Sequence, residues 1–215
     1  MQIAFFDMDK TLLSKSSGTL YVKYLARRNQ ISAREFANVM FVAAQYRLNV
    51  LNFAKAMARL STFIKDGDAA ASKRLCDTWV QEDVLQYVAP KALARLREHE
   101  ARGDYVLLLS ASTQFAVEPV ARQLSIPYRC TELEIVDGKF TGNIVGESCY
   151  AEGKAYWGKR IASERDVLLS DCIFYTDSYS DRALMDIVGH PIAVNPDRQL
   201  LAYAQVKGWP VEMFY

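Results

Sequence analysis

The first apolar run of the chain ends abruptly in two carboxylates, within the sequence IAFFDMDKTLL. Ile3–Phe6 is short, continuous and apolar, which is typical of a strand covered on both faces of a parallel sheet. Asp7 and Asp9 follow this run directly. Because unpaired carboxylates beside a buried strand cost stability, they need a partner. They either cap a helix, for which Asp is well suited, or bind a cation and an anionic ligand, and this stretch alone leaves both interpretations open.

Similar apolar runs recur along the chain, and helical patterns lie between them. The further runs are Tyr105–Leu109, Cys172–Tyr175 and His190–Val194. The helical patterns cover Pro90–Ala101, Thr113–Leu124, Gly153–Glu164 and Asp181–Val188. This alternation predicts an α/β fold with a Rossmann-like, mostly parallel sheet flanked by helices. Asp137-Gly138, between β-prone runs within Thr131–Val145, predicts an additional hairpin.

Residues 15–87 break the alternation, because they contain helical patterns without a convincing strand. Ser32-Ala33-Arg34-Glu35 has the form of a capping box and predicts a helix running toward Tyr46. A second helix is expected over Val50–Ile64, and Asp68 is expected to cap a third that runs to Tyr87. We therefore predict an all-helical cap domain over 15–87, inserted after the first strand, and a core domain formed by 1–14 and 88–215.

The bulk properties exclude several classes of partner. The formal net charge is +1, so no general attraction to nucleic acid or to a membrane surface is expected. No apolar stretch reaches the length of a membrane span, and no basic segment precedes the first apolar run as in a signal peptide. The four cysteines show no CxxC spacing and are expected to be reduced thiols. We predict a cytoplasmic protein whose partner is a small molecule.

Polar side chains follow the ends of three predicted strands. Asp7, Ser110 and Asp177 stand at these ends, Asp181 comes four residues after Asp177, and Lys154 opens a predicted helix. In open α/β sheets, ligands bind beyond the carboxyl ends of the strands. Each residue has a structural alternative, since the serine and the aspartates suit helix caps and a lysine is usually solvated. Their convergence on one sheet edge favours a binding site.

At this point the chain is identified as similar to a known family. The order DMDKT, LLLSAS, GK and TDSYSD resembles the four motifs of the haloacid dehalogenase (HAD) superfamily. The helical insert resembles the cap of its subfamily IB, the phosphoserine-phosphatase-like branch. CTELEIVDGKFTGNIVGESCYAEGK resembles the substrate-side hairpin and lysine motif of that branch, and VGHPIAVNPD resembles its last segment. The resemblance thus covers nearly the whole chain.

The resemblance implies an aspartyl-phosphate mechanism with Mg²⁺ as cofactor. Asp7 would be the nucleophile, because a carboxylate is ionised near neutral pH and attacks phosphorus. Asp9 would give a proton to the leaving alcohol and take one from the attacking water. The metal ligands implied are a carboxylate oxygen of Asp7, the backbone carbonyl of Asp9 and a carboxylate oxygen of Asp177, which suit the oxygen preference of Mg²⁺. Asp181 would orient this shell from behind or through water.

The resemblance also implies a set of residues that bind the phosphoryl group. Ser110 and Lys154 would contact the phosphoryl oxygens, and Lys154 would also keep Asp7 ionised. Thr11 and the backbone amides around Ala111 would complete the cradle.

The sequence departs from the family pattern at several positions. Lys10 stands where many relatives have a small residue, and its role is open. Thr176, Ser178 and Ser180 differ from the residues that phosphoserine phosphatases tend to carry in the last motif. The cap begins with Ser14-Lys15-Ser16-Ser17, where phosphoserine phosphatases have a glutamate that binds the substrate amine. Phosphoserine is therefore expected to be a poor substrate.

The expected function is a magnesium-dependent phosphomonoesterase that acts on a small phosphorylated metabolite. Histidinol phosphate or a related amino-alcohol phosphate is the favoured substrate, and its amine would need an acid from the cap. The candidate acids are Glu35, Asp66, Asp68, Glu82 and Asp83. The alternatives are a phosphoserine phosphatase, a phosphotransferase or phosphomutase using the same site, and a non-catalytic module that binds a phosphorylated ligand.

Overall fold

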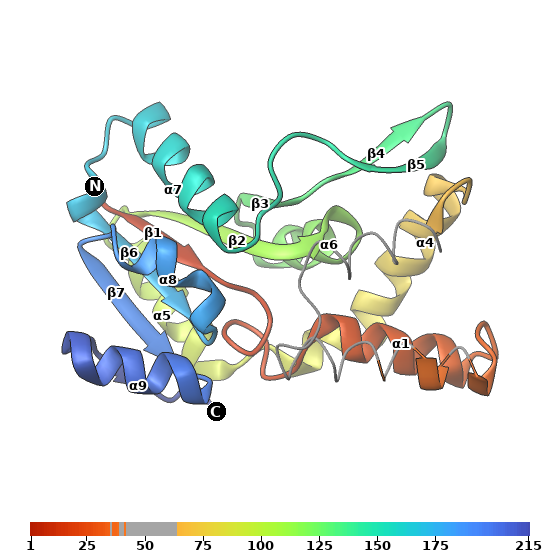
Figure 1. The fold of residues 1–215 in the computed structure, drawn as a ribbon, viewed down its shortest axis with the longest axis horizontal. Helices are drawn as coiled ribbons and strands as arrows, with labels where there is room; N and C mark the ends of the chain where they lie inside the picture. The colour runs from red at the N-terminus through yellow and green to blue at the C-terminus, as the bar shows by residue number, and fades with distance from the viewer. Residues whose placement is uncertain (35, 39–40, 42–63) are drawn as a thin grey trace.

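A computed structural model describes residues 1–34, 36–38, 41 and 64–215. Its centre is a six-stranded sheet with the order β3-β2-β1-β6-β7-β8, in which every neighbouring pair is parallel (Figure 1). The strands are β1 Ile3–Phe6, β2 Tyr105–Thr113, β3 Tyr128–Thr131, β6 Cys172–Thr176, β7 His190–Val194 and β8 Val211–Glu212. The predicted parallel α/β sheet is therefore confirmed, with the predicted first strand at its centre.

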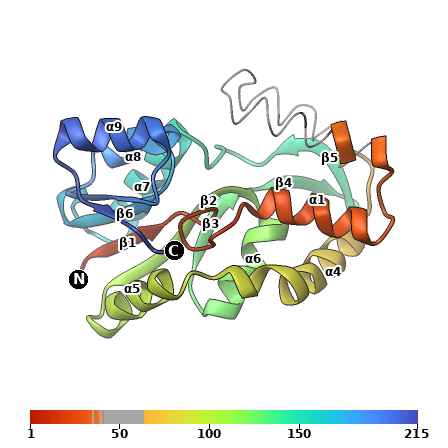
Figure 2. The same cartoon turned by 90° about the horizontal axis from the view of Figure 1, so that it is seen from below.

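Helices cover both faces of the sheet, as Figures 1 and 2 show. They are α5 Pro90–Ala101, α6 Gln114–Leu124, α7 Glu152–Glu164, α8 Arg182–Met185 and α9 Arg198–Lys207. Side chains alternate between the faces of a strand, and β1 follows this rule. Ala4 and Phe6 share a core with residues of α5 and α6, whereas Ile3 and Phe5 share another with residues of α7, α8 and α9. All four are fully buried, which explains the continuous apolar run.

Five elements differ from the prediction made from the sequence. Strand β2 continues to Thr113, beyond the predicted end at Leu109. The helix predicted over Asp181–Val188 is shorter, because a 3₁₀ turn covers Tyr179–Asp181 and α8 ends at Met185. Strands β3 and β8 and helix α9 lie in segments for which no element was predicted. β3 and β8 are short edge strands with few buried side chains, so neither gives a strong apolar pattern.

The described part of the predicted insert is helical. It contains α1 Ser17–Arg27, α4 Ala69–Trp79, a π-helical turn over Val80–Val84 and a 3₁₀ turn over Leu85–Tyr87. Asp68 caps α4 as predicted, since its carboxylate accepts a 2.9 Å hydrogen bond from the Ala71 N–H. The helical conformation continues to Tyr87 but changes type after Trp79. The helix predicted over Val50–Ile64, except its last residue, and most of the one predicted from Ser32 to Tyr46 lie outside the described residues.

The two segments that enter and leave the insert lie side by side. Leu13 and Val88 form an antiparallel bridge, the Ser14 N–H donates to the Tyr87 carbonyl at 2.8 Å, and the Ala89 N–H donates to the Leu12 carbonyl at 2.9 Å. Residues 12–14 and 87–89 thus pair with each other where the chain enters and leaves the insert. The division into domains at 14/15 and 87/88 stays a prediction, because buried residues of α1 and α4 share one core cluster with α5 and α6.

The predicted hairpin is present as a separate two-stranded antiparallel sheet of β4 Leu133–Val136 and β5 Lys139–Ile144. Asp137 and Gly138 both have positive φ, of 50° and 76°, as a two-residue turn of this kind requires. Gln114 of α6 ties the hairpin to the sheet domain, since its side chain exchanges two 2.9 Å hydrogen bonds with the Leu133 backbone. The turn of the hairpin reaches the start of α4 (Figure 1), where the Ala69 N–H donates to the Gly138 carbonyl.

Two further expectations concern the cysteines and the membrane. All four cysteines are buried and free of disulfides, in agreement with the expectation of reduced thiols. Among the described residues, no helix combines the length and apolarity needed to cross a bilayer.

Candidate active site

The predicted site residues meet at the carboxyl edge of the central strands. Asp7 follows the last residue of β1, Ser110 lies on the neighbouring β2, and Asp177 follows β6 on the other side. Lys154 lies in the first turn of α7. The side chain of Lys154 is only 2% exposed, so it is not a solvated lysine. Asp181 stands at the N-cap position of α8, but its side chain makes no capping hydrogen bond there.

Lys154 lies between two aspartates. Its Nζ is 2.6 Å from Asp7 Oδ1 and 2.7 Å from Asp181 Oδ2. Thr176 Oγ1 donates a 2.6 Å hydrogen bond to the same oxygen of Asp181. Two carboxylates therefore fix the ammonium group, and Thr176 in turn holds one of them. The third N–H of the ammonium group is left for one further oxygen.

A glycine allows α7 to begin in close contact with the loop that precedes it. A Cβ at Gly153 would lie 1.9 Å from the Ser148 carbonyl oxygen, which no side chain tolerates. Ala151, two residues earlier, has φ +50° and turns the chain sharply into the helix. The GK motif thus has a steric reason, since the glycine permits the approach that buries Lys154.

Burial dominates the electrostatics of the cluster. It raises the pKa of Asp7 to about 7, although the charge of Lys154 opposes the shift. It also raises the pKa of Asp177 to about 8, and the neighbouring charge of Asp7 adds to this effect. Burial lowers the pKa of Lys154, but the charges of Asp181 and Asp7 outweigh it and raise that pKa overall. The lysine is therefore firmly charged, while the carboxylates are short of positive partners.

Asp9 contacts the first helix of the insert. Its Oδ1 accepts a 2.9 Å hydrogen bond from the Ser17 N–H, its Oδ2 accepts a 3.0 Å bond from the Ser17 hydroxyl, and Ser16 Oγ lies 3.5 Å away. The carboxylate thus caps the N-terminus of α1 from outside the helix. Helix capping was one of the two interpretations that the sequence left open for this residue. Burial raises the pKa of Asp9. The Asp9 carboxylate, which is proposed for proton transfer, is therefore hydrogen-bonded directly to the start of the insert.

A chain of hydroxyls extends this link to β2. Ser17 Oγ is 3.2 Å from Ser112 Oγ, and the Ser112 N–H donates to Ser110 Oγ at 3.2 Å. Ser17 was not predicted as a site residue, because a serine at the start of a helix is usually explained as a helix cap. Helix α6 begins at Gln114, and its N-cap residue is Thr113, whose side chain makes no capping hydrogen bond. Neither Ser110 nor Ser112 therefore caps this helix.

The loop from Asp7 to Thr11 supplies two further groups. Thr11 is fully buried, and its Oγ1 has no hydrogen-bond partner among the described residues. A buried hydroxyl of this kind costs stability unless a ligand satisfies it. Ala111 follows Ser110 on β2 and is half-buried. Lys10, whose role was open, has φ +55° and places its Nζ 3.6 Å from Asp177 Oδ2.

The donor set suits a hard cation. Asp7 and Asp177 offer carboxylate oxygens. Burial raises their pKa values because it disfavours the anionic forms, and a bound cation would stabilise those forms. Among the described residues, no group of three or more His, Cys, Asp or Glu side chains could hold a metal ion. The implied Mg²⁺ set does not need such a group, because it combines two carboxylates with the Asp9 carbonyl. The residues present therefore fit Mg²⁺.

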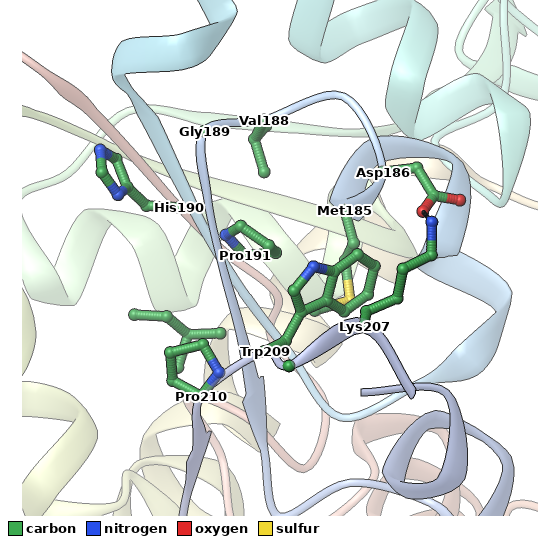
Figure 3. Close-up of a pocket in the computed structure, with 11 residues that line it drawn as sticks. Met185, Asp186, Val188, Gly189, His190, Pro191, Lys207, Trp209 and Pro210 are labelled. Carbon is green, nitrogen blue, oxygen red and sulfur yellow. Dashed lines mark ion pairs between the residues drawn. The ribbon is translucent and has the colours of Figure 1, made fainter. Parts of the chain in front are cut away.

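A cavity of about 420 Å³ lies elsewhere, beside β7 and α9 (Figure 3). Trp209 and Pro191 line it, and Lys207 at its rim forms a 3.0 Å ion pair with Asp186. None of the predicted site residues lines this cavity. It is thus separate from the cluster around Lys154.

Comparisons with known proteins agree with the motifs. The profile of the haloacid dehalogenase-like hydrolases matches residues 4–186. A protein of Mycobacterium tuberculosis named as a probable phosphatase is 31% identical over 217 residues, which cover 98% of this chain and 75% of that protein. A phosphoserine phosphatase of the same organism is 29% identical, with 98% and 70% covered. A histidinol-phosphatase of Neisseria meningitidis is 30% identical, with 99% and 98% covered.

Solved structures share the fold. A Bordetella pertussis protein of unknown function superposes with a TM-score of 0.89 at 26% identity, covering 99% of this chain and 98% of that one. An aspartyl-phosphate intermediate analogue of phosphoserine phosphatase superposes with a TM-score of 0.72 at 20% identity, covering 100% and 93%. From the family profile and these relatives, the chain is a phosphatase of the haloacid dehalogenase-like hydrolase family, in its phosphoserine-phosphatase-like branch.

Proposed function

We propose that the protein is a magnesium-dependent phosphomonoesterase that hydrolyses a small phosphorylated metabolite through a phosphoryl group carried on Asp7. The observation that supports this proposal best is the buried position of Lys154 between Asp7 and Asp181. A buried cation beside a nucleophilic carboxylate reduces the repulsion between that carboxylate and an anionic phosphoryl group. A module that only binds a phosphorylated ligand needs no such nucleophile.

The residues of the chain divide the reaction between them. The Asp7 carboxylate attacks phosphorus, while Lys154, Ser110, Thr11 and the amides around Ala111 bind the phosphoryl oxygens. Thr11 supports this role through its buried hydroxyl, which has no hydrogen-bond partner in the part of the chain that the structure describes. The same cradle serves attack and hydrolysis, because the phosphoryl group is bound in both steps.

Asp9 moves the proton in this scheme. In its protonated form it gives a proton to the leaving alcohol oxygen, and in its ionised form it accepts one from the water that cleaves the acyl phosphate. Burial supports the first role, since it raises the pKa of Asp9 and favours the protonated form. Ser17 holds the carboxylate in place through two hydrogen bonds.

Mg²⁺ would be held by Asp7, the Asp9 carbonyl and Asp177, with Asp181 behind them. When bound, it supplies positive charge that stabilises the phosphoryl oxygens. Exhaustive chelation followed by a Mg²⁺ titration tests this requirement, and full activity after chelation would contradict it.

The substrate remains a proposal at the level of chemical class. We favour an amino-alcohol phosphate such as histidinol phosphate, supported by the histidinol-phosphatase that matches nearly the full length of both chains. Phosphoserine is the second candidate, because a phosphoserine phosphatase is similarly related. At the start of the insert, Ser16 and Ser17 contact Asp9 and bring no carboxylate of their own to bind an amine.

Three of the five acids proposed for binding the amine have other partners. Asp68 caps α4, Glu82 pairs with Arg28 at 2.6 Å, and Asp83 pairs with Arg27. Glu35 lies outside the described residues. Asp66 remains a candidate for the amine-binding acid.

The decisive assay compares kcat/KM for histidinol phosphate, phosphoserine and an aryl phosphate. A buried ammonium without a charged partner is costly, so phosphoserine is expected to be at least roughly tenfold poorer than the aryl phosphate. A hundredfold preference for phosphoserine would overturn the argument from Ser16. Release of inorganic phosphate without an added acceptor would exclude the phosphotransferase and phosphomutase alternatives. The cytoplasmic location and the absence of nucleic-acid partners stay predictions.

A further inference from the structure

The last residues of the sequence return to the loop that follows β1. Phe214 is buried in the core beside Tyr175 of β6, with ring centroids 6.1 Å apart. Asn195 holds the same segment at two points. Its Oδ1 accepts a 2.9 Å hydrogen bond from the Phe214 N–H, and its Nδ2 donates a 3.0 Å bond to the Tyr215 carbonyl. The backbone beside Tyr215 is therefore fixed independently of any contact that its side chain makes.

The Tyr215 side chain reaches the nucleophile loop. Its hydroxyl donates a 3.0 Å hydrogen bond to the Lys10 carbonyl, across 205 positions of sequence. Lys10 has φ +55°, in the left-handed region that costs a residue with a side chain about 1 kcal/mol or more. A loop held in this conformation needs contacts that favour it over the alternatives. The hydrogen bond from Tyr215 is such a contact.

The geometry of the peptide bond carries this effect to the phosphate cradle. The Lys10 carbonyl and the Thr11 N–H belong to one planar trans peptide, in which they point in opposite directions. The hydrogen bond to Tyr215 therefore also fixes the direction of the Thr11 N–H. The same hydrogen bond restrains the backbone of Lys10, whose Nζ lies 3.6 Å from Asp177 Oδ2. The bond from Tyr215 therefore adds to the backbone hydrogen bonds that hold this loop.

We propose that Tyr215 is a positioning residue, whose hydroxyl holds the Lys10–Thr11 peptide in the orientation that binds the transferred phosphoryl group. The inference rests on the proposed function of Asp7 and its loop. Tyr215 is half-exposed and does not need to touch the substrate for this role. It acts through the loop, so its effect is expected on the binding of phosphate as well as on turnover.

The experiment compares two variants that each lose a single phenolic oxygen. Tyr215→Phe removes the bond to Lys10 and keeps the ring. Tyr203→Phe is the matched control, because the Tyr203 hydroxyl bonds to Asp186 at 3.0 and 3.1 Å, outside the site. The measurements on the full chain are the inhibition constant of inorganic phosphate, kcat/KM for an aryl phosphate, and the melting temperature.

Tyr215→Phe is expected to raise the inhibition constant of phosphate and to lower kcat/KM, each about fivefold, as a hydrogen bond of ordinary net strength implies. Its melting temperature is expected to match that of Tyr203→Phe, whose kinetics are expected to equal those of the wild type. Equal phosphate inhibition in both variants would overturn the proposal. A lower melting temperature with unchanged inhibition would also overturn it, because it would give Tyr215 a purely structural role.

Failure of this inference is distinguishable from failure of the proposed function. If Asp7→Asn remains active, the proposed function is wrong. If Asp7→Asn is inactive while Tyr215→Phe behaves like Tyr203→Phe, only the role of Tyr215 is wrong.

Discussion

Replacing Lys154 with Met is expected to destabilise the protein strongly and to abolish phosphatase activity. Met keeps most of the side-chain volume but removes the charge that lies 2.6 Å from Asp7 and 2.7 Å from Asp181. Removing one partner of a buried ion pair leaves uncompensated charge and costs about 3–5 kcal/mol. For a chain of this size, that corresponds to a fall in melting temperature of about 6 °C or more.

Lys207→Met is the matched control for this change. Lys207 pairs with Asp186 at 3.0 Å, but the lysine side chain is 43% exposed. Exposed ion pairs contribute little to stability because water screens them, so this variant is expected to stay close to the wild type in stability and activity.

The loss of stability in Lys154→Met is expected to depend on pH. The pKa of Asp7 in the folded protein, about 7, already lies above its ordinary value, and it rises further when Lys154 no longer lowers it. The folded state then binds the proton more tightly than the unfolded state, so stability is greatest at low pH and is lost as pH rises through the folded pKa.

Urea unfolding at pH 5 and pH 8, with metal removed by a chelator, measures this difference. Lys154→Met is expected to be destabilised more at pH 8 than at pH 5, relative to the wild type. A destabilisation no larger than that of Lys207→Met, or one independent of pH, would refute the assignment of a buried charge cluster.

Three further predictions concern other parts of the site and the core. Ser17→Ala removes the 3.0 Å bond to Asp9 and is expected to slow hydrolysis of an alkyl phosphate about fivefold. Hydrolysis of an aryl phosphate is expected to be spared, because its good leaving group needs less protonation. Equal losses for the two substrates would count against this role of Ser17. Asp177→Ala is expected to raise the Mg²⁺ concentration for half-maximal activity roughly tenfold or more, and an unchanged Mg²⁺ titration would exclude Asp177 as a ligand. Ca²⁺ is expected to inhibit the wild type. Burial lowers the pKa of His99, which is bonded to Asp104 at 2.9 Å, so its contribution to stability is expected to be lost as pH drops below about 6.5. The difference in the midpoint of urea unfolding between the wild type and His99→Gln measures this contribution, and a difference that does not change with pH would rule out His99 as its source.

Local pattern predicted the elements whose two faces are buried. Ile3–Phe6 and His190–Val194 match their strands to the residue, because continuous burial leaves a continuous apolar run. Helix α9 had signals that were overlooked, since Asp197 caps it through the Leu200 N–H and Gly208 ends it with positive φ. Its amphipathic pattern is weak, because Leu201 and Val206 are exposed.

The site was predictable to the extent that its residues stand in recognisable motifs. Asp7 and Lys154 are 147 positions apart, and only the position of each motif at the end or start of an element indicated that they meet. Ser17 and Tyr215 carry no such signal, because a helix-opening serine and a tyrosine near the end of the sequence have many ordinary roles. Their contacts with Asp9 and Lys10 come from tertiary packing, which no local pattern encodes.

The central claim is that Asp7 carries the phosphoryl group. The most direct measurement is intact-mass analysis of the protein after mixing with an aryl phosphate and quenching in acid, carried out for the wild type and for Asp7→Asn. The account predicts that the wild type gains the mass of one phosphoryl group, and that Asp7→Asn gains none, which locates the group on Asp7. Asp7→Asn is also expected to lose essentially all turnover while remaining folded. Phosphoryl transfer to a different residue, or turnover of Asp7→Asn near the wild-type rate, would contradict it.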